Sequence, residues 1–220
     1  MSTRAARVTA AVAVLLTAPA PAAAKRESSF VLSGYRVEHR LSVQLDADGR
    51  PDRALVLRRK KKLGAGISDR RLVVLRSDRS GGYSTAGEGR RILLCSSCGG
   101  AFFGTLDAPV RLSSKDTTLI VKQSFGSRTV TEQTFRLALR QAGAQLIGYD
   151  ELERDRATGA WTSRSTNLLT RVRITEQYRP GRRIVRKTSS LDVEPIMLSR
   201  VDRDHPLRGS PGQGHSATRS

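Results

Sequence analysis

The 220-residue sequence contains only two cysteines, three histidines and 5% aromatic residues. Two cysteines cannot build a four-thiolate zinc site within one chain. Few aromatic residues lie among the charged ones, so there are few side chains on which a base could stack. A nucleic-acid partner is therefore not favoured. A GxSxG elbow, an HExxH zinc motif and a phosphate-binding glycine loop are also absent from the sequence. We therefore infer no catalysed reaction and expect a protein that is not an enzyme.

Long apolar runs are missing as well, and the one short run lies near the N-terminus. Arg4 and Arg7 supply positive charge, Val8–Leu16 is apolar, and Ala22–Ala24 offers the small residues that signal peptidase requires. The run is too short for a membrane span, which needs about 20 apolar residues. Residues 1–24 are therefore predicted to be a cleaved signal peptide. The protein is expected in the periplasm or outside the cell, without integral membrane association.

The remaining chain is long enough for one domain with an adequate core. Proline and glycine are scattered instead of being gathered into an internal linker, so residues 25–201 are predicted to form a single, mainly β domain. Residues 202–220 consist largely of Gly, Ser, Pro, Arg and His, and such a composition cannot offset the entropy of ordering. We expect a disordered basic tail there.

Period-two alternation and short apolar runs predict strands. Val37, Leu41, Val43 and Leu45 are expected on one face of a strand, and residues 134–141 suit a strand better than a helix because Phe135, Leu137 and Leu139 alternate with polar residues. Further runs are Ala54–Leu57, Leu72–Leu75, Leu119–Val121 and Ile184–Val185. No βαβ rhythm occurs. The sequence therefore predicts an antiparallel meander that forms a sandwich, a barrel-like sheet or a partial propeller-like sheet.

An acidic segment has the ligand spacing of a calcium loop. With Gln44 as position one, Asp46 and Asp48 occupy positions three and five, Arg50 can offer its carbonyl at seven, and Asp52 lies at nine. Calcium takes about six to eight oxygen ligands, and a glycine at position six permits the sharp turn. The same residues suit an Asx-type turn, in which aspartates accept hydrogen bonds from backbone amides without a metal. Both interpretations stay open.

The strand, acidic loop and second strand over residues 41–58 resemble the FG-GAP (integrin α-type) repeat. In that family the loop lies between two strands of a propeller blade and usually binds calcium. The segments Leu94–Gly100, Gln145–Asp150 and Thr166–Thr170 resemble uncharacterised exported bacterial proteins that carry one such loop. The resemblance implies export and Ca²⁺ but no activity. Gln44 stands where the family has Asp, so one negative charge is missing and weaker binding is implied.

Cys95 and Cys98 are the only cysteine pair, and in an oxidising compartment they are predicted to form a disulfide. A loop this short gives about 2 kcal/mol in the chain-entropy account. The CxxC spacing is also that of thiol–disulfide oxidoreductases, whose first cysteine lies at a helix N-terminus. Gly99 and Gly100 make a poor helix start, so a structural disulfide is favoured and a periplasmic oxidoreductase is the alternative function.

Lys and Arg number 39 against 20 Asp and Glu, which gives a formal net charge of +19. Such a charge attracts polyanions. The only dense basic block is Arg58–Lys62, and a solvated loop end is its default interpretation. A polyanion-binding protein that uses this block is a further alternative. A second charged run, 150–156, mixes acids with Arg154 and Arg156 and is expected to be a charge-balanced hairpin end. The leading hypothesis is an exported, non-enzymatic binding or structural module with a protein or polyanionic partner.

Overall fold

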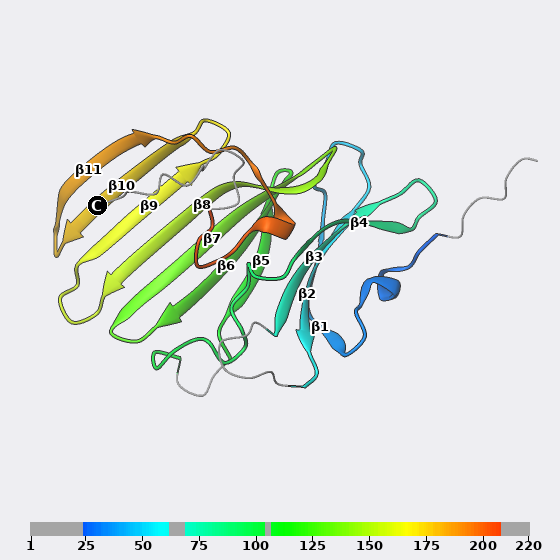
Figure 1. Ribbon diagram of the computed structural model, residues 1–220, viewed down its shortest axis with the longest axis horizontal. Helices are drawn as coiled ribbons and strands as arrows, with labels where there is room; N and C mark the ends of the chain where they lie inside the picture. Colours follow the sequence, from blue (N-terminus) through cyan, green and yellow to red (C-terminus); the bar gives the residue numbers. More distant parts are fainter. Residues whose placement is uncertain (1–23, 62–68, 104–106, 208–220) are drawn as a thin grey trace, which may run out of the picture.

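The computed structural model describes residues 24–61, 69–103 and 107–207, which form two antiparallel sheets (Figure 1). The small sheet contains, in sequence order, β1 (Tyr35–Val43), β2 (Asp52–Arg59), β3 (Arg70–Ser77) and β4 (Tyr83–Gly89). The large sheet contains, also in sequence order, β5 (Val110–Lys115), β6 (Thr118–Gly126), β7 (Thr129–Arg140), β8 (Gly143–Asp155), β9 (Trp161–Asn167), β10 (Val172–Arg179) and β11 (Arg182–Ser190). The short strand β12 (Ile196–Met197) pairs with β8, and two 3₁₀ turns complete the structure, η1 (Glu27–Phe30) and η2 (Leu198–Arg200).

The predicted mainly β antiparallel meander is confirmed. Neither sheet closes on itself, so the arrangement is that of a sandwich or partial sheet. Residues 134–141 fall almost entirely within β7, as the alternation predicted. No helix in the described part of the chain is long and apolar enough to cross a membrane. The predicted signal peptide, apart from its last residue, lies outside the described residues.

One hydrophobic core joins the two sheets. Val56 and Val74 from the small sheet and Val121 and Phe135 from the large sheet are completely buried in it. The turn η2 fills the space between β4 and β8, where Leu198 is also completely buried. These side chains leave water together, which is the main favourable contribution to folding.

The outer face of the small sheet is covered by the segment before β1. Leu55, Leu57, Val73 and Leu75 form a second buried cluster there, with residues 30–32 packed against it. Figure 1 shows η1 beside the small sheet, on the side away from the large sheet. Strands β2 and β3 are therefore buried on both faces. Double burial accounts for the unbroken apolar runs that the sequence shows in these strands.

A β-bulge in β1 changes which residues share a face. The expectation that Val37 lies on the same face as Leu41 is wrong, since Val37 packs on the outer cluster and Leu41 on the core between the sheets. The register shifts between Val37 and His39, and Glu38 is the extra residue. Such an extra residue reverses the alternation and redirects a side chain. Here Glu38 reaches Arg70 on β3, with Oε1 2.6 Å from Nη2.

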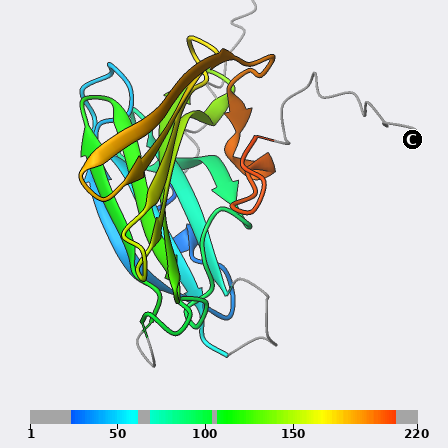
Figure 2. The same ribbon diagram turned by 90° about the vertical axis from the view of Figure 1, so that its left-hand side faces the viewer.

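The large sheet extends beyond the small one. Strands β5 to β8 pack on the core, whereas in β11 every residue except Ser189 is exposed. Figure 2 shows the large sheet from this side, with the C-terminal segment to one side of it. The β9–β11 part of the sheet is thus held mainly by its ladder hydrogen bonds to β8 and by cross-strand side-chain contacts.

The start of the expected disordered tail is ordered. Asp202 forms a β-bridge with Arg91, and the carbonyl of Arg203 accepts a 3.0 Å hydrogen bond from Nε2 of the buried Gln133. Nη1 of Arg203 donates in turn to the carbonyl of Leu93 at 3.0 Å. These hydrogen bonds and the packing of Leu207 against the core hold residues 202–207 to the fold, which differs from the disorder expected there from composition. Residues 208–220 lie outside the described part of the chain.

Candidate functional site

The acidic loop joins β1 to β2, and Asp52 holds it closed. Asp52 is completely buried. Its Oδ2 accepts a 2.9 Å hydrogen bond from the amide of Leu45, and its Oδ1 accepts one of 2.9 Å from the amide of Ser77 on β3. A buried carboxylate needs such donors, because an unsolvated charge is otherwise very costly. Asp52 therefore ties the loop to the neighbouring strand through backbone amides.

The other acidic side chains of the loop are also satisfied within the protein. Asp48 accepts from the Arg50 amide at 2.8 Å and pairs with the Arg50 guanidinium, and this amide bond is the main reason that the pKa of Asp48 is lowered. Asp46 accepts from the Asp48 amide at 3.2 Å, and partial burial raises its pKa. Gln44 is exposed. The loop thus has the hydrogen bonds of an Asx-type turn.

These contacts bear on whether Ca²⁺ fits the loop. Asp52 directs its oxygens at amides of β3 and of the loop, while Asp48 and Asp46 meet Arg50 and Arg76, with 3.5 Å from Asp46 Oδ2 to Arg76 Nε. Across residues 24–61, 69–103 and 107–207, no three His, Cys, Asp or Glu side chains come close enough together to hold a metal ion. In this conformation the donor set does not fit the ion. Calcium at Gln44, Asp46, Asp48, Arg50 and Asp52 stays a prediction.

The predicted Cys95–Cys98 disulfide is present, with Cα atoms 5.1 Å apart. Ser96, between the two cysteines, donates from its amide and its hydroxyl to the buried Asp69, at 2.8 and 2.7 Å. Cys95 is only 5% exposed, and turns rather than a helix follow Cys98. The arrangement therefore lacks the exposed thiol and the helix dipole that thiol–disulfide exchange uses. It fixes the segment between β4 and β5.

The dense basic block of the sequence, Arg58–Lys62, is largely used by the fold itself. Arg58 pairs with Asp107 and lies 3.5 Å from Glu38. Arg59 lies over the ring of Tyr35, 5.2 Å from its centre. Lys60 and Lys61 are exposed beyond the end of β2, and Lys62 lies outside the described residues. Arg58 is thus already neutralised, and of the described part of the block only Lys60 and Lys61 are exposed cations.

A different set of cations gathers on the outer face of the large sheet. Val110 and Val121 point into the core, so the residues that follow them, Arg111 on β5 and Lys122 on β6, lie on the opposite face. Arg111 and Lys122 are register partners across the two strands. Like charges placed directly opposite each other destabilise a sheet by roughly 0.2–1 kcal/mol. The fold thus tolerates a local electrostatic cost at this position.

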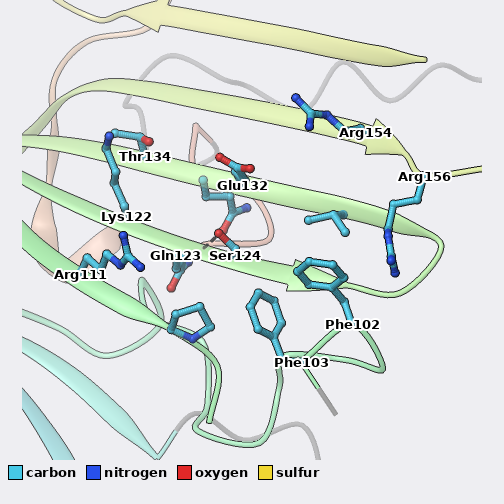
Figure 3. A pocket seen from close by; sticks show the side chains of 13 residues that line it. Phe102, Phe103, Arg111, Lys122, Gln123, Ser124, Glu132, Thr134, Arg154 and Arg156 are labelled. Carbon is cyan, nitrogen blue, oxygen red and sulfur yellow. Dashed lines mark hydrogen bonds between the residues drawn. The ribbon is translucent and has the colours of Figure 1, made fainter. Parts of the chain in front are cut away.

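These cations line a groove with a volume of about 560 Å³ (Figure 3). Arg154 at the end of β8 and Arg156 just after it contribute two more positive charges. Phe102 and Phe103, from the segment after the disulfide, form the opposite wall, and their rings meet edge to face at 4.8 Å. We call this hollow the cationic groove and define it by Phe102, Phe103, Arg111, Lys122, Ser124, Glu132, Thr134, Arg154 and Arg156.

The charges of the cationic groove are not neutralised. Within the described part of the chain, Arg111, Lys122 and Arg154 form no ion pair with a carboxylate. Arg156 lies over the ring of Phe102, 4.7 Å from its centre, which leaves its charge in place. Among the described residues, Glu132 is the single acidic residue that lines the groove. The groove therefore has an excess of positive charge, and an anion is the ligand that it can attract.

The acids next to Arg154 in the sequence do not balance its charge. Asp150 pairs with Arg136, and Glu151 and Glu153 pair with Arg164 at 2.6 and 2.7 Å. Glu151 lies on the inner face of β8, opposite the buried Gln133, and Glu153 follows on the same face, whereas Arg154 faces outward. Asp155 lies 3.5 Å from Arg128. The expectation of a charge-balanced hairpin end is therefore wrong for Arg154.

A second hollow adjoins the cationic groove along the sheet. It is lined by Trp161, Tyr178 and the β10–β11 turn, and Arg154 lines both hollows. The rings of Trp161 and Tyr178 stack with their centres 3.7 Å apart and their planes inclined by 10°. We call this pair the aromatic shelf. It extends the cationic groove toward the edge of the sheet.

Sequence inspection missed the cationic groove because its residues come from separate strands. The signal that could have found it is the alternation of Arg111 and Lys122 with buried valines, which places both cations on an outward face. That Arg111 lies directly opposite Lys122 depends on the register of β5 and β6, which the β5–β6 turn sets and the alternation alone does not give.

The fold and the site together define a two-sheet antiparallel β protein with an un-neutralised cationic groove on one sheet face. Comparisons with protein-family models, with curated proteins and with solved structures find no match to this chain. The resemblance of residues 41–58 to the FG-GAP repeat thus stays a prediction.

Proposed function

We propose that the protein is an exported, non-enzymatic binding module that holds an anionic polymer in the cationic groove. The observation that carries this proposal is the excess of cations at one hollow, with Arg111 opposite Lys122 and no carboxylate pairing either of them in the described chain. An electrostatic cost of this kind is tolerated where a ligand relieves it.

Three further features support the proposal. The chain carries a formal net charge of +19, which attracts polyanions over a distance of several ångströms and raises the rate of encounter. The groove has a volume of about 560 Å³, and it shares Arg154 with the hollow at the aromatic shelf. The disulfide fits an oxidising compartment, and residues 1–24 have the composition of a signal peptide, so export is part of the proposal.

The test compares two double variants that lose the same charge. Heparin serves as a general polyanion, and its affinity for the exported chain is measured by titration calorimetry at fixed salt. We expect Lys122→Ala/Arg154→Ala to weaken binding at least tenfold, or about 1.4 kcal/mol. Lys60→Ala/Lys61→Ala removes two exposed cations elsewhere and should weaken binding by less than about twofold, because screening limits the effect of distant charges. Equal effects of the two double variants would overturn the assignment of the ligand to the groove.

A further inference from the structure

The cationic groove contains hydrogen-bonding groups that a purely phosphate-binding site would not need. Glu132 on β7 and Ser124 on β6 are register partners, and Thr134 lies two residues further along the same face. Glu132 is exposed and has no hydrogen-bonding or ion-pair partner in the part of the chain that the structure describes. A carboxylate accepts strongly from hydroxyl groups but repels phosphate. The groove thus suits a ligand that carries both acidic groups and hydroxyls.

The aromatic shelf offers an apolar surface in line with the cations. Arg154, Trp161, Tyr178 and Arg183 are successive register partners on β8, β9, β10 and β11. The two rings thus lie between two arginines in one row across the sheet. From β5 to β10 this face crosses five strand spacings, about 24 Å along the sheet at roughly 4.8 Å each. A ligand that uses both the groove and the shelf must be an extended chain.

Part of the aromatic ring surface along this path is already covered by other side chains. Trp161 and Tyr178 cover one face of each other, and Arg156 lies over one face of Phe102. Binding of single-stranded nucleic acid depends on stacking bases on open ring faces. The remaining ring edges and part-covered faces are apolar surfaces against which the C–H groups of a sugar ring can pack. The side-chain mixture therefore favours a sugar polymer.

We propose that the anionic polymer is an acidic polysaccharide that lies across the strands from the cationic groove to the aromatic shelf. Arg111, Lys122 and Arg154 hold its acidic groups, Glu132 accepts hydrogen bonds from its hydroxyls, and the shelf packs against a sugar ring. This inference rests on the proposed function and adds the chemical class of the ligand and its path along the sheet.

The role of Glu132 is tested with two ligands whose affinities should change in opposite directions when Glu132 is removed. Polygalacturonate carries carboxylates and hydroxyls, whereas a single-stranded oligonucleotide carries phosphates. We expect Glu132→Ala to weaken polygalacturonate binding by about threefold or more, since a charge-assisted hydrogen bond is lost, and to strengthen oligonucleotide binding, since a repulsive charge is lost. Tighter binding of both ligands by Glu132→Ala would overturn the assignment of a hydroxyl-accepting role.

The path along the sheet is tested with Trp161→Ala and ligands of two lengths. We expect about fivefold weaker binding of long-chain polygalacturonate, because the packing on the shelf is lost. Digalacturonate is too short to span from Arg111 and Lys122 to the shelf, so the loss of its binding should be smaller than the loss for the long polymer. Leu169→Ala is the matched control, because Leu169 is 53% exposed and lies in the β9–β10 turn at the other end of these strands. Unchanged binding of the long polymer to Trp161→Ala would overturn the proposed path.

The failure of this inference can be told apart from that of the proposed function. If Lys122→Ala/Arg154→Ala loses polymer binding but Glu132→Ala and Trp161→Ala behave like the parent, the groove binds anions and the polysaccharide assignment is overturned. A parent protein that prefers the oligonucleotide, or vesicles containing phosphatidylserine, over polygalacturonate also overturns it. If the double variant binds every polyanion as the parent does, the groove itself is excluded and both proposals fail.

Discussion

Two groups of cations in this protein have opposite surroundings. Around β2 and β3, Arg58 and Arg70 meet Glu38, Asp69 and Asp107, and the side chain of Arg70 is 2% exposed. In the cationic groove, the cations face one another and a single glutamate. Arg58 begins the dense basic block of the sequence and Arg70 lies outside it, while the groove cations are scattered over the chain. The comparison teaches that free charge depends on the acids that the fold brings near, and not on the density of basic residues in the sequence.

The sharpest test of this comparison is Arg70→Met. Nη2 and Nε of Arg70 lie 2.6 and 2.7 Å from Glu38, and Nη1 donates to the carbonyl of Ala108 at 2.7 Å. Arg70→Met leaves Glu38 with the more distant Arg58 as its cation and leaves the Ala108 carbonyl without its donor. We therefore expect the free energy of unfolding to fall by about 3 kcal/mol, the lower end of the range for breaking a buried ion pair. Urea unfolding measures the change. Arg111→Met, at the groove, is the control and should not destabilise the protein. Equal losses for the two variants would erase the distinction between the groups.

Replacing the buried Asp52 of the acidic loop should lower the stability less than Arg70→Met does. Asp52→Ala leaves the amides of Leu45 and Ser77 without their acceptor, and we expect a loss of about 1–3 kcal/mol. The chemical-denaturation midpoint should fall while its slope stays the same. Asp48→Ala removes an exposed carboxylate from the same loop and serves as the matched control. A larger loss for Asp48→Ala than for Asp52→Ala would contradict the assignment of Asp52 as the residue that holds the loop.

Removing a cation of the groove should raise the stability, and by less than the preceding substitutions lower it. Lys122→Gln relieves the repulsion from Arg111 directly across the ladder, so we expect a gain in stability of about 0.2–1 kcal/mol. Lys115 lies on the same hairpin with Thr118 as its register partner, and Lys115→Gln should leave stability unchanged. Thermal unfolding at low salt measures both. If Lys122→Gln is the less stable of the two, the groove carries no electrostatic cost.

Adding calcium should change the thermal stability least of all. Because the aspartates of the loop are satisfied by amides and arginines, we expect the thermal midpoint in calcium to differ from that in chelator by less than about 1 °C. An ion bound by the native state alone at 100 times its Kd would add about 2.7 kcal/mol. A rise of several degrees would therefore support the calcium loop predicted from the sequence. The Asp48→Ala variant shows whether any rise comes from the loop.

Much of the fold could be predicted from the sequence. The runs Ala54–Leu57 and Leu72–Leu75 belong to β2 and β3, and the alternation around Phe135 belongs to β7. The disulfide also followed from spacing and compartment. These features are local, so neighbouring residues contain the information that specifies them. The face on which Val37 lies could not be predicted, because it depends on the bulge at Glu38. Glu38 pairs with Arg70 on β3, and this contact joins residues that are far apart in the sequence.

The candidate site could be predicted only in part. Asp46, Asp48 and Asp52 were recognised as one loop, but the direction of Asp52 depends on Ser77 of β3. To predict the groove, one would need the registers of strands β5 to β8 and the position of the segment that carries Phe102. Local composition specifies neither of these. A strand register set by turns and packing decides which of many basic residues become neighbours.

The open edge of the large sheet has a consequence for assembly. Strand β11 presents an unpaired backbone edge, and Arg182, Arg183, Arg186 and Lys187 are exposed along it. Positive charges on such an edge keep it from pairing with the edge of another molecule through mutual repulsion. A bound polyanion that reached β11 would cancel this repulsion. A ligand chain long enough to bind two copies would then bridge them, so clusters would form with protein in excess and give way to single copies at saturating ligand.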